Sequence, residues 1–307
     1  TQELVNMAHR VALSDATVMI SGESGSGKEV FARLIHDNSP RTNGPFVAIN
    51  CAAIPENMLE AVLFGYEKGA FTGAVQANAG KFEQANGGTL LLDEISEMEL
   101  SLQAKLLRVI QERVVERLGG NKSVDLDVRI LATTNQNLRE EVAQGRFRED
   151  LYYRLNVFPL HLPPLRQRPA DVVPLAQHFL CHFAGGQDLQ FTQSALLKLS
   201  SHSWPGNVRE LENVVQRALI MRTGLDLDDQ AILFEDISAS VDSQPAQLAV
   251  EPALGSGLKA REQAMIFDAL KAEKGSRKET AARLGISPRT LRYKLARFKE
   301  AGIALPG

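Results

Sequence analysis

The sequence predicts an α/β protein whose parallel sheet is followed by helical segments. Apolar, strand-like runs alternate with helical patterns through the first half of the chain, which is typical of a parallel sheet covered by helices. These runs are almost continuously apolar, as expected for strands buried on both faces. After Pro163 and Pro164, helical patterns continue without strands. At roughly 150 residues per domain, the 307 residues allow about two domains and an appendage.

The predicted elements divide the chain into four parts. In residues 1–165 the strands are TVMI, FVAIN, TLLLDE and VRILATT, and an amphipathic helix begins at Lys28. The patterns DVVPLAQHFLCHF and SALLKLSSHSW predict a smaller all-helical domain over residues 166–235. Residues 236–257 are rich in Ser, Ala, Gln, Pro and Gly and predict a flexible linker. Helical periodicity returns in LKAREQAMIFDALKA, so residues 258–307 are expected to form a further helical domain.

Composition places the chain among ordinary globular proteins. Hydrophobic residues make up 44% and charged residues 23% of the sequence. No apolar run has the length of a spanning helix and no signal peptide is visible, so we expect the cytoplasm and no membrane partner. Cys51 and Cys181 lack neighbours at metal-ligand spacing and are expected to be buried apolar side chains. The histidines form no H-E-x-x-H pattern that would support a zinc hydrolase.

The charge is unevenly distributed along the chain. The whole sequence carries a net charge of -3, whereas residues 258–300 carry +7, which leaves -10 on the remainder. An acidic body with a basic tail is the pattern expected when the tail alone meets nucleic acid.

A glycine-rich segment, GESGSGKE, connects the first predicted strand to the first helix. Three glycines allow its backbone N–H groups to converge on phosphate oxygens, and the lysine supplies a positive charge near the outer phosphates. Glu29 departs from the general motif, which has Ser or Thr there to contact Mg2+. An ordinary glycine-rich turn is the alternative. The expected nucleotide-binding residues are Gly22, Glu23, Ser24, Gly25, Ser26, Gly27, Lys28 and Glu29.

Carboxylates at the end of a later strand would complete this site. Asp93 and Glu94 end the run TLLLDE, at the edge where parallel sheets bind ligands. Asp93 is suited to hold Mg2+, and Glu94 to orient or deprotonate an attacking water. The next run ends in Thr134 and Asn135, which could report on the outermost phosphate. The pair of motifs therefore predicts binding and hydrolysis of ATP.

With these motifs, the chain resembles the bacterial enhancer-binding proteins that activate sigma-54 RNA polymerase, a branch of the AAA+ ATPases. The most specific sign is the hexapeptide GAFTGA, which in that family engages the sigma factor. Its glycines permit a tight hairpin with Phe and Thr at the tip, whereas in isolation the Phe could equally tuck into the core. The resemblance implies sigma-factor contact by Gly69, Ala70, Phe71, Thr72, Gly73 and Ala74.

The resemblance also implies roles for four further residues. Asn50 would restrain Glu94, although it could simply cap a strand end. Arg148 and Arg154, expected on one helix, would reach into a neighbouring subunit's site, whereas surface ion pairs are the alternative. Arg209 would sense the nucleotide from a helical lid formed by residues 166–235. Glu29 is usual in this family.

The basic tail has the pattern of a helix-turn-helix. A helix ends near Gly285, and a second begins at Ser287 and Pro288, which suit a cap and a first turn. The tail resembles the dimeric factor-for-inversion-stimulation class of DNA-binding domain, and ISPRTLRYKL is similar to members that control flagellar genes. Contacts to double-stranded DNA, rather than a solvated basic face, are expected from Arg289, Thr290, Arg292, Tyr293 and Lys294.

Together these features imply an ATP-driven transcription activator. Arginines acting between subunits imply a homo-oligomeric ring, hexameric by resemblance, that remodels the sigma-54 closed complex. The rival functions are another AAA+ remodeller and a DNA-binding regulator that uses ATP only as an assembly switch. The family's receiver or sensor domain, which would link the protein to a two-component system, is missing. Because residue 1 is Thr rather than Met, we expect a fragment of a longer protein.

Overall fold

A computed structural model describes residues 1–222, 224, 226–234 and 280 of the chain. Residues 1–235 cluster as one unit. The predicted linker and, apart from residue 280, the predicted helix-turn-helix lie outside the described residues, as do the five residues predicted to contact DNA. Within the described part, no helix is long and apolar enough to cross a membrane.

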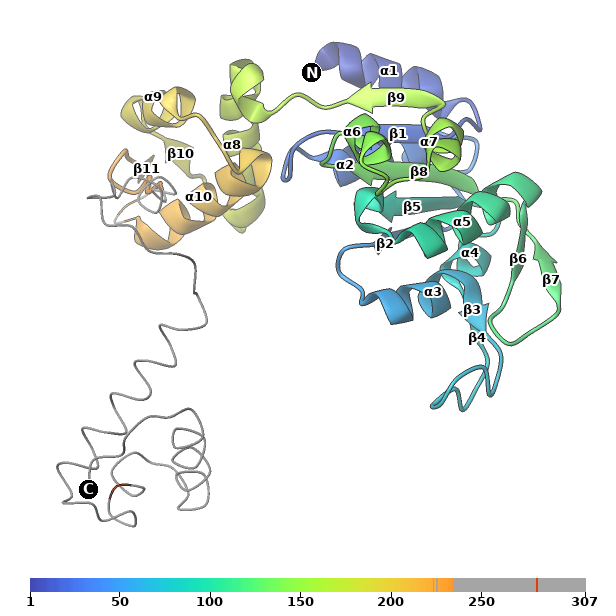
Figure 1. Ribbon diagram of the computed structural model, residues 1–307. Helices are drawn as coiled ribbons and strands as arrows, with labels where there is room; N and C mark the ends of the chain where they lie inside the picture. The colour runs from blue at the N-terminus through green and yellow to red at the C-terminus, as the bar shows by residue number, and fades with distance from the viewer. Residues whose placement is uncertain (223, 225, 235–279, 281–307) are drawn as a thin grey trace, which may run out of the picture. The chain divides into compact units, whose positions relative to one another are not determined.

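A five-stranded parallel sheet forms the centre of the first unit (Figure 1). Four of its strands were predicted, and β9 was not, because its segment FPLH contains a proline and lies at the edge of the sheet, where proline is tolerated. Since all strands run parallel, their carboxyl ends meet at one edge. In spatial order the strands are β2 (Phe46–Asn50), β5 (Thr89–Asp93), β8 (Arg129–Thr134), β1 (Val18–Ser21) and β9 (Phe158–His161).

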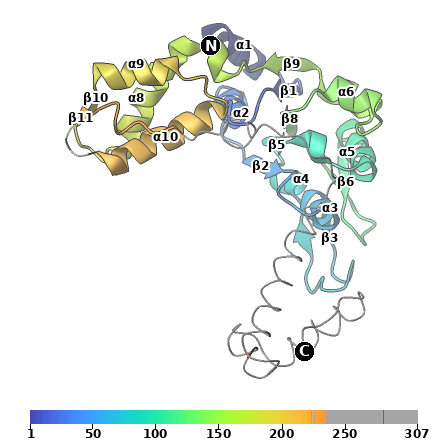
Figure 2. The same cartoon turned by 60° about the vertical axis from the view of Figure 1, so that its left-hand side comes forward.

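Helices cover both faces of the sheet (Figures 1 and 2). Leu91 and Leu131 face a core that includes helices α1 (Gln2–Ala12) and α2 (Lys28–Asp37). Leu92 lies in the opposite core. Since burying a leucine contributes about 1.5–3 kcal/mol, the central strands fix this layered arrangement. The opposite core includes residues of α3 (Glu56–Phe64), α4 (Lys81–Gln84), α5 (Leu100–Glu112), α6 (Leu138–Ala143) and α7 (Glu149–Leu155).

The expectation that every strand is buried on both faces is wrong for β2. Ala48 is exposed, and only Ile49 of this strand is buried. The reason is its position, since β2 is an end strand of the sheet and pairs with β5 alone within it.

Two small antiparallel hairpins extend from this layer. The first joins β3 (Gly65–Tyr66) to β4 (Asn78–Ala79), and the second joins β6 (Val114–Glu116) to β7 (Ser123–Asp125). They lie side by side, because Glu67 N donates to Leu118 O at 3.0 Å and Leu118 N donates to Gly65 O at 3.0 Å.

The helical lid has its own core around Trp204, which is fully buried and donates from Nε1 to Leu199 O at 3.0 Å. The prediction of an all-helical lid was incomplete, because two-residue strands, too short for a sequence pattern, form a parallel pair. Cys51 is buried as expected, but the expectation was wrong for Cys181, which is exposed. The lid contains η2 (Leu165–Gln167), η3 (Pro169–Asp171), α8 (Val172–Phe183), α9 (Gln193–Ser201), α10 (Asn207–Met221), β10 (Gln190–Phe191) and β11 (Asp226–Leu227).

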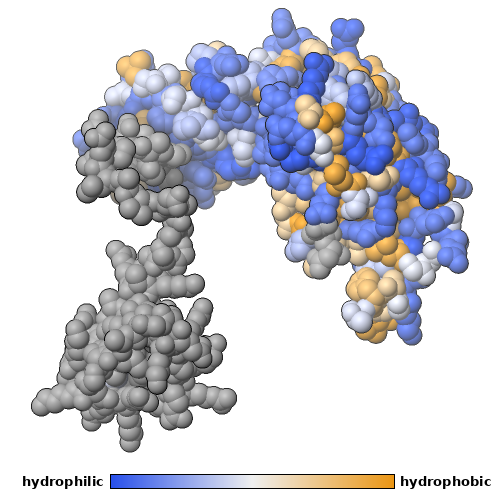
Figure 3. All heavy atoms as spheres, in the orientation of Figure 1, coloured by the Kyte–Doolittle hydropathy of each residue, from blue (hydrophilic) through white to orange (hydrophobic). Residues whose placement is uncertain are grey.

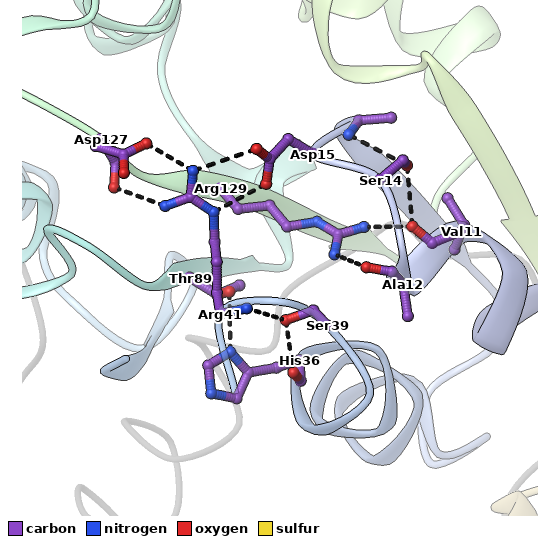
Figure 4. Close-up of polar contacts among 11 residues, drawn as sticks. Val11, Ala12, Ser14, Asp15, His36, Ser39, Arg41, Thr89, Asp127 and Arg129 are labelled. Atoms are coloured by element: carbon purple, nitrogen blue, oxygen red, sulfur yellow. Dashed lines mark hydrogen bonds and ion pairs between the residues drawn. The ribbon is translucent and has the colours of Figure 1, made fainter. Parts of the chain in front are cut away.

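A buried arginine at the start of β8 holds the end of α1 (Figure 4). The Arg129 side chain is among the largest fully buried ones, and its guanidinium donates to Ala12 O and Val11 O at 2.9 Å each. These carbonyls lie in the last turn of the helix, where acceptors lack partners within the helix and the helix dipole favours a cation. Val11 O also accepts from Ser14 N at 3.1 Å and Ser14 Oγ at 3.0 Å. Nearby, Arg41 bridges Asp15 and Asp127. Since α1 packs on α2, this anchor supports the helix that follows the glycine-rich segment.

Candidate functional site

Residues 22–27 of the glycine-rich segment form a loop between β1 and α2, and Lys28 and Glu29 begin that helix. The whole segment, residues 22–29, is called the phosphate loop below. Gly27 precedes the helix with φ 100°, and Gly25 has φ 74°, conformations that favour glycine. A Cβ on Gly25 would lie 2.5 Å from Gly206 O, so only glycine fits against the lid there. The first amides of a helix lack intrahelical partners, so those of α2 are suited to bind a phosphate, as at other helix ends.

Lys28 occupies the centre of the phosphate loop. It is 7% exposed, and its Nζ donates to Gly22 O at 2.8 Å and Glu23 O at 3.1 Å. Burial lowers the pKa of Lys28, and the charges of Asp93 and Glu94 oppose that shift. Beside it, the buried Ser26 Oγ has no hydrogen-bond partner among the described residues. An orphaned hydroxyl in such a loop is suited to an anionic ligand.

The acidic residues lie where the sequence predicted, at the carboxyl end of β5. Asp93 accepts hydrogen bonds from Asn50 Nδ2 at 2.8 Å and from Thr133 Oγ1. A carboxylate has about four acceptor positions, so Asp93 retains capacity for a cation and fits the predicted Mg2+. The described residues contain no group of three or more metal-ligating side chains, so phosphates and water would supply the other ligands.

Asn50 differs from its predicted arrangement. Its amide contacts Asp93 rather than Glu94, and its Oδ1 accepts from Ala52 N and Ala53 N. Strand β2 pairs with β5 so that Asn50 lies opposite Asp93, and this register explains the partner. Asn50 therefore joins the carboxylate to the turn that leads into α3.

Glu94 has an unusual backbone conformation. Its φ of 53° and ψ of 49° lie in the left-handed region, where non-glycine residues are strained by about 1–3 kcal/mol. Thr133 stabilises this turn, because its Oγ1 accepts from Glu94 N at 3.0 Å. Such strain concentrates at functional sites. A threonine within a buried strand gives no sequence signal for this role.

The two polar residues at the end of β8, Thr134 and Asn135, differ in their exposure. Thr134 is buried, and its Oγ1 donates to Ser96 Oγ at 3.2 Å. Asn135 is exposed and lines a cavity of about 480 Å³ together with Gly22 and Glu23. Asn135 therefore shares a cavity with the start of the phosphate loop, and its contact with the outermost phosphate stays a prediction.

The lid meets the phosphate loop through Arg209. Its Nη1 donates to Ser24 Oγ at 3.0 Å, so the predicted nucleotide sensor lies beside the loop. An apolar cavity of about 400 Å³ adjoins Ser26 and Gly27. This cavity was not predicted, because its lining comes from both domains: Val30, Phe31, Leu175, Phe179 and Val208.

The two predicted intersubunit arginines lie around α7. Arg148 was expected on the helix, but it precedes the helix and pairs with Asp150 at 2.7 Å. The difference arises because Arg148 has an extended backbone, with φ -76° and ψ 133°. Arg154 is on the helix and lines a cavity with Asp15 and Arg113. No described contact joins either arginine to the phosphate loop or to Glu94 of its own chain.

The GAFTGA loop (residues 69–74) joins β3 to β4. Gly69 N donates to Ala74 O at 2.9 Å, which closes the loop. Phe71 is 47% exposed rather than tucked into the core, and its ring meets Tyr66 at 4.9 Å in an edge-on arrangement. Thr72 and Gly73 are also exposed, whereas Ala74 is buried and lies away from the exposed tip. In Figure 3 hydrophobic surface is visible at the end of this projection.

An ion-pair cluster supports the base of the loop. Arg117 of the second hairpin contacts Glu83 at 2.7 Å and Glu67 at 3.1 Å, and the arginine lowers the pKa of the Glu83 carboxyl. Ala70 packs on this hairpin, since a Cβ on Gly119 would lie 2.9 Å from the Ala70 Cβ. These contacts join segments distant in sequence, which is why sequence patterns missed them.

The parallel sheet, the phosphate loop, the acidic strand end and the helical lid define the class of AAA+ nucleotide-binding domains. Residues 1–161 match the sigma-54 interaction domain, residues 166–251 the AAA+ ATPase lid domain, and residues 257–298 the Fis family of bacterial regulatory proteins. The chain therefore belongs to the family of sigma-54-dependent activators with a Fis-type DNA-binding domain.

Similar proteins agree with this assignment. The chain is 55% identical to the response regulator protein FleR of Pseudomonas aeruginosa, over 99% of this chain and 69% of that protein. It is 49% identical to the transcriptional regulatory protein FlbD of Caulobacter vibrioides, over 99% of this chain and 70% of that protein. Among solved structures, NtrX from Brucella abortus in complex with ATP is 34% identical, with a TM-score of 0.70, over 96% of this chain and 67% of that chain.

Proposed function

We propose that the chain hydrolyses ATP in a homo-oligomeric ring and uses the energy to remodel the sigma-54 RNA polymerase closed complex into an open complex. One observation carries this proposal. The same fold holds Lys28, Asp93 and Glu94 around the carboxyl edge of one sheet and presents Phe71 and Thr72 on an exposed loop. These features support a site for ATP turnover and a partner-contacting loop within one domain.

The residues of the phosphate loop bind and orient the substrate. Backbone amides and Lys28 hold the phosphates, Arg209 approaches them from the lid, and the apolar cavity beside Gly27 takes the adenine base. Asp93 would hold Mg2+, whose charge would neutralise charge on the phosphates. Glu94 accepts a proton from the water that attacks the γ-phosphorus, and the bond to the bridging oxygen of ADP breaks. Phosphate and ADP are the products.

The ring completes the site from a second subunit. Arg148 and Arg154 would stabilise charge on the transferred phosphoryl group of a neighbour, a role that typically contributes about 10³–10⁵-fold to turnover. Their location away from their own chain's phosphate loop supports this action between subunits. We expect a hexamer.

The nucleotide state reaches the GAFTGA loop through Asn50. Asn50 links Asp93 to the amides of Ala52 and Ala53, and the chain continues through α3 into β3. A change at the carboxylate would shift α3 and thereby raise or lower the loop tip. Residues 258–307 would bind upstream DNA as a dimer. Control of flagellar genes, and activation by a phosphorylation signal through a receiver domain, remain predictions.

Capture of sigma-54 by the whole chain tests this function. With ADP and a transition-state mimic of the γ-phosphate, the wild-type chain should retain sigma-54, and Thr72→Ala should not. A matched control is Thr42→Ala, an exposed threonine outside the site. Failure of the wild type to bind would favour another AAA+ remodeller. Sigma-54 binding and DNA-dependent regulation without any turnover would favour the assembly switch.

A further inference from the structure

The lid contacts four consecutive residues of the phosphate loop. Besides the Arg209 contact with Ser24, Val208 N donates to Gly25 O at 2.9 Å, and Arg168 Nη2 donates to Ser26 O at 2.7 Å. Glu23 is bound by Arg166 and Asn207. The lid thus occupies carbonyls and side chains of the loop rather than the backbone amides that would bind a phosphate.

Asn207 joins three parts of the molecule. It is fully buried at the start of α10, and its Oδ1 accepts from Leu165 N, at the junction of the two domains, at 2.7 Å. Its Nδ2 donates to Glu23 Oε2 and to Ser24 O at 3.1 Å each. The φ of Asn207 is 55°, a left-handed conformation that Asn and Gly tolerate better than other residues. One amide therefore connects the junction, the lid helix and the phosphate loop.

Glu23 completes the arrangement from the loop side. Its carboxylate accepts from Arg166 Nη1 at 2.8 Å and Nη2 at 2.6 Å, a bidentate geometry that is stronger than a neutral hydrogen bond. The donors to this carboxylate all come from residues after the end of β9. The Glu23 side chain therefore points to the lid and not to Lys28, although it was predicted to bind nucleotide.

We propose that Asn207, Glu23 and Arg166 form a latch through which the lid holds the phosphate loop in its nucleotide-binding conformation. The latch residues are positioning residues. They hold the loop from its outer side, so they set the affinity for ATP and ADP, whereas Lys28 and Glu94 govern the chemical step. This inference rests on the proposed function of the loop as an ATP site. It predicts that breaking the latch weakens nucleotide binding while leaving turnover at saturating ATP nearly intact.

Asn207→Gly is the central variant, because glycine accepts the left-handed backbone while the amide is removed. KM for ATP and Kd for ADP should each rise about tenfold, the factor that corresponds to about 1.4 kcal/mol. The kcat should stay within about threefold, since the reacting groups are untouched. Asn213→Ala, an exposed position on the same helix, should change neither value. A merely structural role would lower the thermal midpoint without separating KM from kcat.

A second experiment exchanges the donor and the acceptor of the hydrogen bond between Asn207 and Glu23. Asn207→Asp places two carboxylates together and should weaken ADP binding more than Asn207→Gly does. Adding Glu23→Gln lets the new amide donate to the carboxylate introduced at position 207 and should recover most of the lost affinity. Glu23→Gln alone, at a half-exposed side chain, should raise KM about threefold, as expected for a weakened charge-assisted hydrogen bond.

The outcomes separate the latch from the ATPase itself. Glu94→Gln should abolish turnover while retaining ADP affinity, and persistent turnover in that variant would contradict the proposed function. If Glu94→Gln behaves as expected but Asn207→Gly leaves Kd unchanged, or lowers kcat as much as it raises KM, the latch is refuted. It is also refuted if the double variant binds ADP no better than Asn207→Asp.

Discussion

Replacing Arg129 with methionine should release helix α1 from the sheet. Methionine fills much of the same volume but cannot donate to the carbonyls of Val11 and Ala12, which Arg129 contacts at 2.9 Å each. Hydrogen bonds from a charged group contribute about 1.5–3 kcal/mol each. Removing the buried charge returns part of this energy, since the cost of desolvating it disappears. The expected net loss is about 2–3 kcal/mol.

Amide hydrogen exchange can measure this loss at α1 itself. An isolated helix as short as α1 is marginal in water, so its protection depends on its packing and on the anchor. In Arg129→Met, the hydrogen-bonded amides of residues 5–12 should exchange about 30–150 times faster, because each 1.4 kcal/mol is a factor of ten. Arg108→Met is the matched control, since Arg108 is exposed and pairs with Glu112 at the surface. Protection of residues 5–12 within about twofold of wild type in Arg129→Met would refute the reasoning.

Three further predictions follow from the contacts of the site. Gly25→Ala should weaken ATP binding far more than Gly145→Ala. Both glycines have a φ of about 70°, but of these two only Gly25 has backbone atoms where a Cβ would lie. Equal effects of the two substitutions in a binding titration would contradict the close approach of the lid to Gly25. Tyr66→Ala should lower sigma-54 capture about 2–10-fold with ATPase activity retained, whereas Tyr66→Phe keeps the ring contact with Phe71. The hydrogen bonds from Arg166 and Asn207 lower the pKa of Glu23 to about 2. This contact therefore stabilises the fold fully at pH values above the ordinary glutamate pKa of about 4.3, and the stabilisation is lost as the pH falls toward 2. Thermal unfolding between about pH 5 and pH 3 should therefore depend less on pH in Glu23→Gln, and identical slopes would contradict the pKa shift.

The sequence was informative wherever a local pattern determines structure. Runs such as TLLLD predicted β5 because four of its residues are fully buried, and the glycines of the phosphate loop predicted the turn between β1 and α2. Strand β9 was missed because the proline in FPLH argues against a strand, and the sheet accepts it only at its edge.

The missed parts of the site depend on contacts across the fold. The partner of Asn50 is set by the register of β2 against β5, so sequence similarity alone suggested Glu94 instead of Asp93. The contact of Asn207 with Glu23 joins residues that are 184 positions apart. Such pairs leave no periodicity, since each residue belongs to a different element.

Open-complex formation is the measurement that tests the central claim most directly. With sigma-54 RNA polymerase, promoter DNA and the whole chain, hydrolysable ATP should open the promoter, and a non-hydrolysable analogue should not. Thr72→Ala should hydrolyse ATP without opening the promoter, and Glu94→Gln should do neither. Promoter opening that persists in both variants would contradict the account.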